Sequence, residues 1–363
     1  MVKEKVWETN DTCSFILAPL DNQDIFSSYE AGQFVTLFIK INGELVSRSY
    51  SFSSSRAVDE NAMITVKRVE NGIMSNYLLD QVNEGQTVKI APPTGHFFKK
   101  KNLDENSTQG ILLFGAGSGV TPLYSILKYS LQKHPQVSVL LVNSNSTEND
   151  IIFKDQLSNL NAASPQLNVK HYISQVGKRL SDHSVKDEYL TFIKERGLTD
   201  SNTDTYLCGP ETYMNMIQET LIGAGHAPDR IFRESFNTQT EVNIDSLNRP
   251  KESESPQVFI ECTPDDFEVT ENKTITAIID NEEVTIENTG EDNVLEALLN
   301  AGEAPPFSCM AGSCSACLCK IIDGKILQKD IGILSEAEVA SGRFLSCQSI
   351  GVSESIKFEY IED

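Results

Sequence analysis

The sequence has no long hydrophobic run, which excludes a membrane-spanning helix. Its longest apolar stretches, Ile111–Phe114 and Val137–Val142, are far shorter than the roughly 20 residues that cross a bilayer. The N-terminal stretch MVKEKVWETND also lacks the apolar core of a secretory signal. We therefore expect a cytoplasmic protein.

Basic side chains are scarce. The 30 Lys and Arg residues stand against 52 Asp and Glu, which gives a formal net charge of −22. Such acidity makes nucleic acid and anionic membranes poor partners. The imbalance is concentrated near the C-terminus, where residues 257–363 hold 21 acids and 6 bases, a net charge of −15. This charge either keeps the surface soluble or steers a basic partner protein to it.

The 363 residues predict two or three domains. Strand-like segments and polar turns predict an antiparallel β-barrel or sandwich in residues 1–103, and we expect a barrel. Short apolar strands then alternate with amphipathic helices, which predicts an α/β domain with a parallel sheet in residues 104–236. Residues 237–257 have almost no apolar content and are the expected linker. Strands and a short helix resume in residues 258–363.

A cysteine cluster is the strongest chemical signal. Cys309, Cys314 and Cys317 have the spacing C-x4-C-x2-C, and Cys347 follows after 29 further residues. This is the spacing of plant-type [2Fe–2S] ligation, in which four thiolates hold two irons. A zinc site or plain buried cysteines are the alternatives. Three further cysteines lie outside this spacing and are interpreted as packed residues: Cys13, Cys262 and Cys319.

A glycine loop is the second signal. Gly115, Gly117 and Gly119 follow the apolar strand ILLF and lead into a helix through Val120, Thr121 and Pro122. Glycines at such a corner let backbone amides approach a pyrophosphate, and the helix N-terminus favours its charge. A tight strand–helix turn alone would also need glycine. The spacing is not G-x-G-x-x-G, so a simple dehydrogenase is not predicted.

Two short motifs earlier in the chain form the third signal. Arg48-Ser49-Tyr50-Ser51 combines a guanidinium that can pair with a phosphate and an aromatic face that can stack on a ring system. About two dozen residues later, Ser75 in Gly72-Ile-Met-Ser is expected to cap a helix whose first amides would face an anion. Either motif alone is short enough to arise by chance.

The C-terminal segment, about the last hundred residues, resembles a plant-type ferredoxin domain. The likeness includes the helix NVLEALLNAG and the later LSEAEVASGRFLSCQS. The resemblance implies an α+β β-grasp domain whose cluster ligands are Cys309, Cys314, Cys317 and Cys347.

Residues 1–236 resemble the ferredoxin–NADP⁺ reductase family, which combines R-x-Y-S, a G-x-G-x-G-x-T-P loop and a later C-G-P, here Cys208-Gly209-Pro210. The order of the three parts is similar to single-chain reductases of bacterial multicomponent oxygenases, especially the phenylacetyl-CoA oxygenase reductase type. The resemblance implies catalytic roles for Ser51, Cys208 and Glu234. It implies that the cofactors contact Arg48, Ser49, Tyr50, Ser51, Val66, Lys67, Gly72, Met74, Ser75, Gly117, Gly119, Thr121, Cys208, Gly209, Pro210 and Phe236.

The implied function is electron transfer from NAD(P)H through FAD to a [2Fe–2S] cluster, and from there to a partner oxygenase. The five histidines of this chain show no paired spacing of the kind that binds a metal. They are His96, His134, His171, His183 and His226. Oxygen chemistry is therefore expected on the partner. We expect the partner to dock on the acidic ferredoxin domain, and the reductase to be a monomer. The alternatives are a stand-alone ferredoxin or flavodoxin reductase and a non-catalytic redox sensor.

Two choices between cofactors stay open at this stage. Many NADP-using relatives place an arginine after the strand that follows the glycine loop, whereas this chain has VNSNSTEND and no base before Lys154. Lys178 and Arg179 are other candidates to bind a 2′-phosphate. Reductases that use FMN share R-x-Y-S, and only the helix start at Gly72–Ser75 favours FAD.

Overall fold

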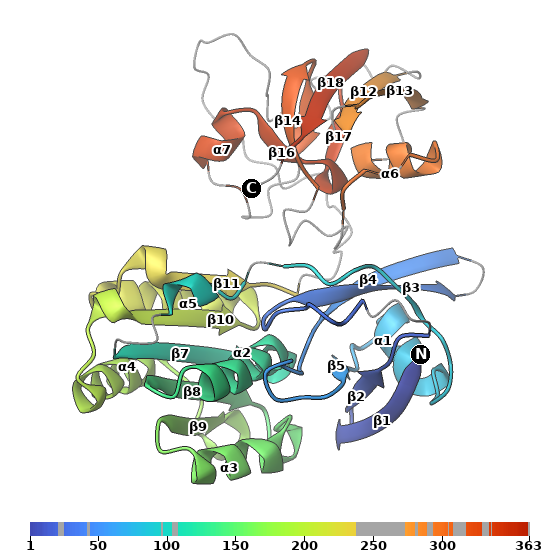
Figure 1. Cartoon of the computed structure of the whole chain (residues 1–363). Helices are drawn as coiled ribbons and strands as arrows, with labels where there is room; N and C mark the ends of the chain where they lie inside the picture. The colour runs from blue at the N-terminus through green and yellow to red at the C-terminus, as the bar shows by residue number, and fades with distance from the viewer. Residues whose placement is uncertain are drawn as a thin grey trace. The chain divides into compact units, whose positions relative to one another are not determined.

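The computed structural model describes residues 1–20, 25–41, 44–95, 97–103, 108–236, 273–279, 282–288, 293–303, 305–307, 317–328, 334 and 336–361. The chain divides into two compact units, Met1–Phe236 and Asn237–Asp363 (Figure 1). The expected linker, Cys262, Cys309 and Cys314 lie outside the described residues. Within the described ranges, no helix is both long enough and apolar enough to cross a membrane.

The N-terminal part of the first unit is a barrel-like antiparallel domain, as predicted. It has two three-stranded sheets, with the orders β1-β2-β5 and β4-β3-β6. Their bounds are β1 (Val2–Thr9), β2 (Thr12–Leu17), β5 (Ala62–Lys67), β4 (Glu44–Ser51), β3 (Phe34–Ile41) and β6 (Lys89–Ile90). Phe15, Leu37 and Phe52 are at most 1% exposed and belong to one core. Helix α1 (Ile73–Gln81) adds Met74 and Leu78 to this core.

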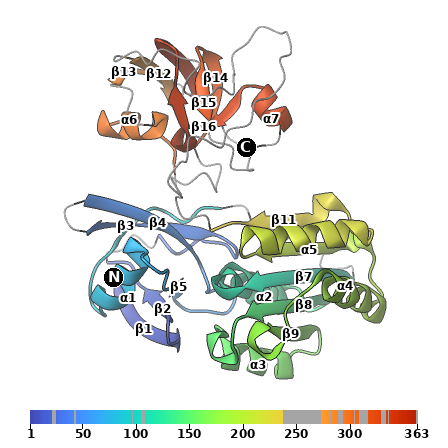
Figure 2. The same cartoon turned by 180° about the vertical axis from the view of Figure 1, so that it is seen from behind.

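A parallel sheet forms the rest of the first unit, with the order β11-β10-β7-β8-β9. The strands are β7 (Gln109–Ala116), β8 (Val137–Asn145), β9 (Leu167–Ile173), β10 (Thr203–Cys208) and β11 (Ile231–Glu234). Strands β7, β8 and β10 are buried along nearly their whole length because helices cover both faces of the sheet (Figure 2). One face packs against α2 (Val120–Lys133) and α3 (Lys154–Ala163), and the other against α4 (Asp182–Arg196) and α5 (Glu211–Gly223).

The strand order indicates where a ligand would bind. From β7 the chain adds β8 and β9 on one side, then crosses over and adds β10 and β11 on the other. In open α/β sheets, ligands bind at the carboxyl ends of the strands where this reversal occurs. The reversal here lies between β7 and β10, and it brings the ends of these strands, Ala116 and Cys208, to the same edge.

The second unit is an α+β domain built on a mixed five-stranded sheet of order β13-β12-β18-β14-β16. Its central strands β12 and β18 are parallel, whereas the other neighbours in the sheet are antiparallel. The elements are β12 (Lys273–Ile279), β13 (Glu282–Asn288), α6 (Val294–Asn300), β14 (Leu318–Asp323), α7 (Glu336–Ala340), β16 (Arg343–Leu345) and β18 (Ser355–Tyr360). A separate pair joins β15 (Ile326–Gln328) to β17 (Ser349–Gly351). The predicted three-part fold class is confirmed.

Candidate functional site

Strand β4 carries the R-x-Y-S motif. Successive side chains point to opposite faces, so Arg48 and Tyr50 share one face and Ser49 and Ser51 the other. The Ser49 hydroxyl lies 2.9 Å from the Thr36 hydroxyl on β3. Tyr50 is half-buried beside the barrel core, and burial raises its pKa above the usual value. The motif therefore presents a neutral aromatic ring and a guanidinium from one face of a strand.

Helix α1 begins one turn earlier than expected. Gly72 is the residue before the helix, with an extended backbone at φ −71° and ψ 122°. The prediction that Ser75 caps the helix is wrong, because Ser75 lies inside the first turn and its hydroxyl accepts a hydrogen bond from the Val69 N–H at 3.1 Å. The first backbone N–H groups of α1 have no partner within the helix and can bind an anion.

Arg68 fixes the position of this helix. Its guanidinium forms two bonds to Asp80 at 2.7 and 2.9 Å and one to Asn76 at 2.6 Å. Val66 and Lys67 precede it at the end of β5. The Val66 side chain is fully buried in the core, so only its backbone could reach a cofactor. Lys67 forms an ion pair with Asp11 at 2.6 Å.

The glycine loop closes tightly against strand β10. A short 3₁₀ turn, Gly117–Gly119, joins β7 to α2. Gly117 has φ +54°, a conformation that favours glycine, and a Cβ built there would meet no atom within 4 Å. A Cβ on Gly119 would lie 2.1 Å from the Cys208 carbonyl oxygen. Only glycine allows this approach. Thr121 follows in the first turn of α2, where it is buried.

The end of β10 carries the C-G-P motif. Cys208 lies in register between Gly115 on β7 and Glu234 on β11. It is fully buried, and burial raises the pKa of its thiol well above the usual value. A Cβ on Gly209 would lie 3.0 Å from the Ala116 Cβ, so this glycine also permits close packing. Pro210 directly precedes helix α5.

One hydrogen bond connects the barrel to the nucleotide domain at this edge. The Ser51 hydroxyl donates to Glu234 Oε2 at 3.0 Å. Burial raises the pKa of Glu234 from 4.5 to about 8, although the bond from Ser51 opposes this shift. The structure therefore brings together Ser51, Cys208 and Glu234, the three residues predicted to be catalytic. Phe236, two residues beyond, is 42% exposed.

Two buried amides near the glycine loop were not predicted as site residues. Asn143 and Asn145 lie at the end of β8, and Asn143 is in register with Gly115. Their side chains are 0% and 9% exposed, and their amide atoms have no hydrogen-bond partner within the described part of the protein. Buried amides normally bond a protein group, water or ligand. The polar stretch VNSN after an apolar strand was the available signal.

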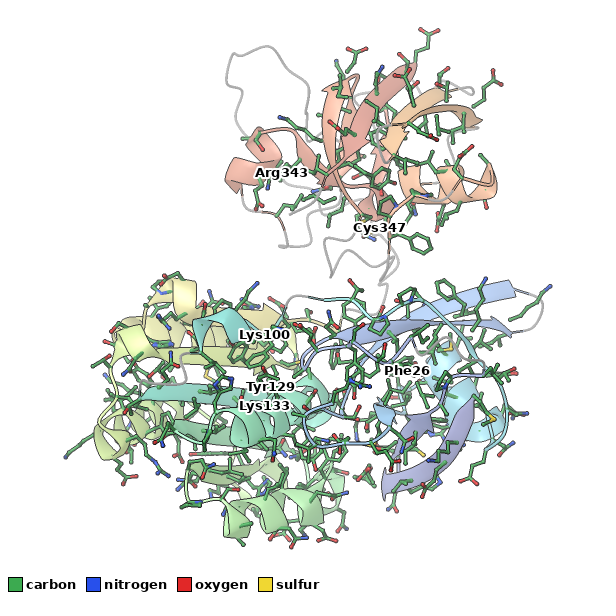
Figure 3. All side chains as sticks on the ribbon, in the orientation of Figure 1. Phe26, Lys100, Tyr129, Lys133, Arg343 and Cys347 are labelled. Carbon is green, nitrogen blue, oxygen red and sulfur yellow. The ribbon has the colours of Figure 1, made fainter. Side chains whose placement is uncertain are left out.

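The second unit holds two of the four predicted cluster ligands close together. The Sγ atoms of Cys317 and Cys347 are 3.2 Å apart, and both residues are at most 3% exposed (Figure 3). Two thiolates this close can bind one iron. Gln348 Nε2 lies 3.7 Å from Cys347 Sγ, where it can donate to the sulfur. Cys319 is fully buried in the sheet core, which confirms its interpretation as a packed residue.

Comparisons with known proteins assign these parts. Family models match an oxidoreductase FAD-binding domain at residues 1–98, an oxidoreductase NAD-binding domain at 113–219 and a 2Fe-2S iron-sulfur cluster binding domain at 277–350. The ferredoxin reductase component of 3-ketosteroid-9-alpha-monooxygenase from Rhodococcus rhodochrous is 30% identical over 99% of this chain and 95% of its own length. The chain belongs to the family of oxygenase reductase components.

Other relatives of this reductase serve different oxygenases. One component of the 1,2-phenylacetyl-CoA epoxidase of Escherichia coli (strain K12) is 26% identical over 97% of this chain and 94% of its own. The glycine betaine monooxygenase reductase subunit of Chromohalobacter salexigens is 27% identical over 96% and 90%. Phthalate dioxygenase reductase shares the fold, with a TM-score of 0.60 and 21% identity over 99% and 96% of the two chains.

The predicted family and cofactor classes are thereby confirmed. The reductase is an electron-transfer oxidoreductase with FAD-binding, NAD-binding and [2Fe–2S] domains. The residues fit these groups: the α1 start and the Gly117–Gly119 loop offer anion-binding amides, and Cys317 and Cys347 offer paired thiolates. The roles of single residues remain predictions.

The close approach at Gly119 yields the first prediction. Gly119→Ala would force the glycine loop away from the Cys208 carbonyl. We expect FAD content to stay unchanged and flavin reduction by NAD(P)H to slow by about a hundredfold, since an error of about 1 Å in position has that effect. The measurement is stopped-flow bleaching of the flavin band.

The matched control is Gly223→Ala in α5, where an added Cβ meets no atom within 4 Å. This variant should reduce its flavin at the wild-type rate. A wild-type rate in Gly119→Ala as well would show that the close approach does not position the nucleotide.

The buried carboxyl of Glu234 gives a pH-dependent prediction. Between pH 4.5 and about 8 the unfolded chain carries an ionised Glu234, whereas the folded protein keeps this group protonated. The free energy of unfolding therefore falls as pH rises through this window. Glu234→Gln has no carboxyl to ionise, so its free energy of unfolding should not show this decrease. The difference in free energy of unfolding between the variant and wild type should therefore grow in favour of the variant, by up to about 1 kcal/mol per pH unit.

Chemical denaturation across this pH range measures the effect. Glu219→Gln, an exposed acid on α5, is the control and should show no pH-dependent difference from wild type. A difference for Glu234→Gln that does not change with pH would mean that Glu234 is already ionised in the folded protein.

Proposed function

We propose that this chain is the reductase component of a multicomponent oxygenase, with the flavin domain in residues 1–103, the nucleotide domain in 104–236 and a linker at 237–257. The family relationship over 99% of the chain supports this role most strongly. When bound, NAD(P)H supplies two electrons at once, FAD accepts them, and the cluster takes one at a time. The protein would hold the nicotinamide against the flavin and exclude water between these two groups.

The flavin site would be formed by β4 and the start of α1. Arg48 and the first amides of α1 are placed to hold the FAD phosphates, with Gly72, Met74 and Ser75 at the helix start. Tyr50 offers its ring to the isoalloxazine. We assign Phe236, which is exposed, to the opposite side of the flavin.

The nucleotide would lie at the strand ends that meet around Gly117, Gly119 and Cys208. Ser51 and Glu234 occupy the same edge. A Glu234 carboxyl that keeps its proton at neutral pH can hold a proton beside the Ser51 hydroxyl. We assign to this pair the exchange of a proton with the flavin, and to buried Cys208 a contact with the nicotinamide.

The oxygenase would dock on the ferredoxin unit. Residues 257–363 have a net charge of −15, from 21 acids and 6 bases. Such a surface attracts a basic face on a partner and accelerates their encounter. The relatives serve a steroid monooxygenase, a glycine betaine monooxygenase and a phenylacetyl-CoA epoxidase, so we propose a separate oxygenase of this general kind as the acceptor.

NADH is the proposed nucleotide. After β8 the chain continues through Glu148 and Asp150, and Asp150 Oδ2 accepts a bond from the Thr147 N–H at 2.9 Å. An acid at the end of the second strand suits a ribose hydroxyl and repels a 2′-phosphate. Lys178 lies beyond the next strand, with its ammonium 5.3 Å from the Tyr172 ring centroid. Its position against this ring favours packing over phosphate binding.

We expect kcat/KM for NADH to exceed that for NADPH by at least about tenfold, a difference of about 1.4 kcal/mol in transition-state binding. Glu148→Lys should reduce this preference, because it replaces repulsion with attraction at the 2′-position. Glu195→Lys, the same charge change at an exposed position of α4, is the control and should leave the ratio unchanged. Equal or better use of NADPH by wild type would refute the assignment.

The modular path of the electrons is tested at the cluster. Cys347→Ser should abolish the cluster absorbance and cytochrome c reduction but leave NADH-dependent ferricyanide reduction intact, because the flavin unit does not need the cluster. Cys319→Ser is the matched control and should keep the cluster, since Cys319 packs in the sheet core. Loss of ferricyanide reduction in Cys347→Ser would contradict the proposed path.

A further inference from the structure

One face of helix α2 is bonded to the barrel at two positions. Thr121, Ser125 and Lys128 are spaced by four and three residues, so they share a face. The Ser125 hydroxyl donates to the Ser54 carbonyl oxygen at 2.5 Å. One turn further on, the Lys128 ammonium forms an ion pair with Asp59. Helix α2, which begins at the glycine loop, is therefore bonded to a barrel segment at two points.

The ion pair joins a buried lysine to a half-buried aspartate, whose side chain is 30% exposed. The Lys128 side chain is only 6% exposed, and its ammonium lies 4.4 Å from the centroid of the Tyr124 ring. Glu8 on β1 is the third charged group near it and receives bonds from Ser14 at 2.6 Å and Gln156 at 3.2 Å. A buried lysine is unfavourable unless its partners hold it in good geometry. Glu8, Asp59 and Lys128 together form a charge cluster between the barrel and the nucleotide domain, with a buried lysine and two half-buried acids.

The barrel residues that form these bonds lie shortly after β4, the strand that we propose binds the flavin. Ser54 follows Ser51, the last residue of β4, by three positions, and its hydroxyl lies 2.6 Å from the Tyr29 hydroxyl. Asp59 Oδ2 accepts a bond from the Ser55 N–H at 2.6 Å. The segment that receives Ser125 and Lys128 is thus held by its own bonds. The two contacts set where α2 lies relative to β4.

We propose that Lys128 is a positioning residue for hydride transfer, because its ion pair with Asp59 ties α2, and with it the glycine loop at the start of this helix, to the segment that follows β4. This inference rests on the proposed function, in which the Gly117–Gly119 loop binds the nucleotide and β4 binds the flavin. A small shift of α2 would move the nicotinamide away from the flavin. Errors of about 1 Å in such reactions slow them by about a hundredfold.

The test compares Lys128→Met with Lys128→Arg in the full-length holoprotein. Lys128→Met keeps the apolar stem and removes the charge, and we expect flavin reduction at saturating NADH to slow by about tenfold or more. FAD content should stay the same, and the dissociation constant for NADH should change by no more than about twofold. The charge-transfer absorbance between nicotinamide and flavin should weaken. Lys128→Arg keeps the charge and should restore both the rate and the absorbance.

Lys133→Met is the matched control, since Lys133 is an exposed lysine on the same helix (Figure 3). It should match wild type in rate and absorbance. If Lys128→Met lowers thermal stability but keeps the wild-type reduction rate and charge-transfer absorbance, Lys128 only stabilises the fold and the proposal is overturned.

A second variant covers the case in which Lys128→Met does not fold. Asp59→Asn removes the partner charge with little change in shape, and it should give the same slower reduction and weaker absorbance; a wild-type rate in this variant would overturn the proposal. Amide hydrogen exchange at residues 117–121 should also increase. If neither NADH nor NADPH reduces the wild-type flavin, the proposed function itself fails, and this outcome is distinct from a failure specific to Lys128.

Discussion

The close approach of Gly119 to the Cys208 carbonyl is the constraint on which the site depends. A Cβ at Gly119 would lie 2.1 Å from that oxygen, so the start of α2 and the end of β10 can meet only if this residue is glycine. The contact spans the point where the strand order reverses, which is where α/β sheets bind ligands. It also fixes the edge at which Cys208 stands beside Glu234. The close packing of these two elements therefore depends on the absence of one side chain.

The Ser51–Glu234 bond adds a second requirement, because it joins two segments 183 residues apart. Burial of Glu234 raises its pKa to about 8, so a carboxyl at this edge stays neutral near pH 7. A neutral acid costs less to bury than a carboxylate and can hold a proton beside the hydroxyl. The same raised pKa that keeps this carboxyl neutral would also suit the proton exchange that we propose for it.

Local signals predicted the features that depend on neighbouring residues in the chain. The glycine loop, the cysteine spacing and the alternation of strands and helices were all readable from the sequence. The cap of α1 was misassigned because Gly and Ser both favour helix starts, and spacing alone did not choose Gly72 over Ser75. Asn143 and Lys128 were missed because their significance depends on which helix covers which strand, and only the tertiary structure supplies that information.

The two units also differ in what their function demands of them. Hydride transfer moves an atom between bound groups and needs fixed geometry, which we propose the charge cluster of Glu8, Asp59 and Lys128 supplies within the first unit. Delivery to a partner depends on encounter, and long-range charge promotes encounter without fixed contacts. The charge is distributed accordingly, with a net −5 in residues 1–237 and −17 in residues 238–363. Under the proposed function, paired charges would serve position in one unit, and net charge would serve association in the other.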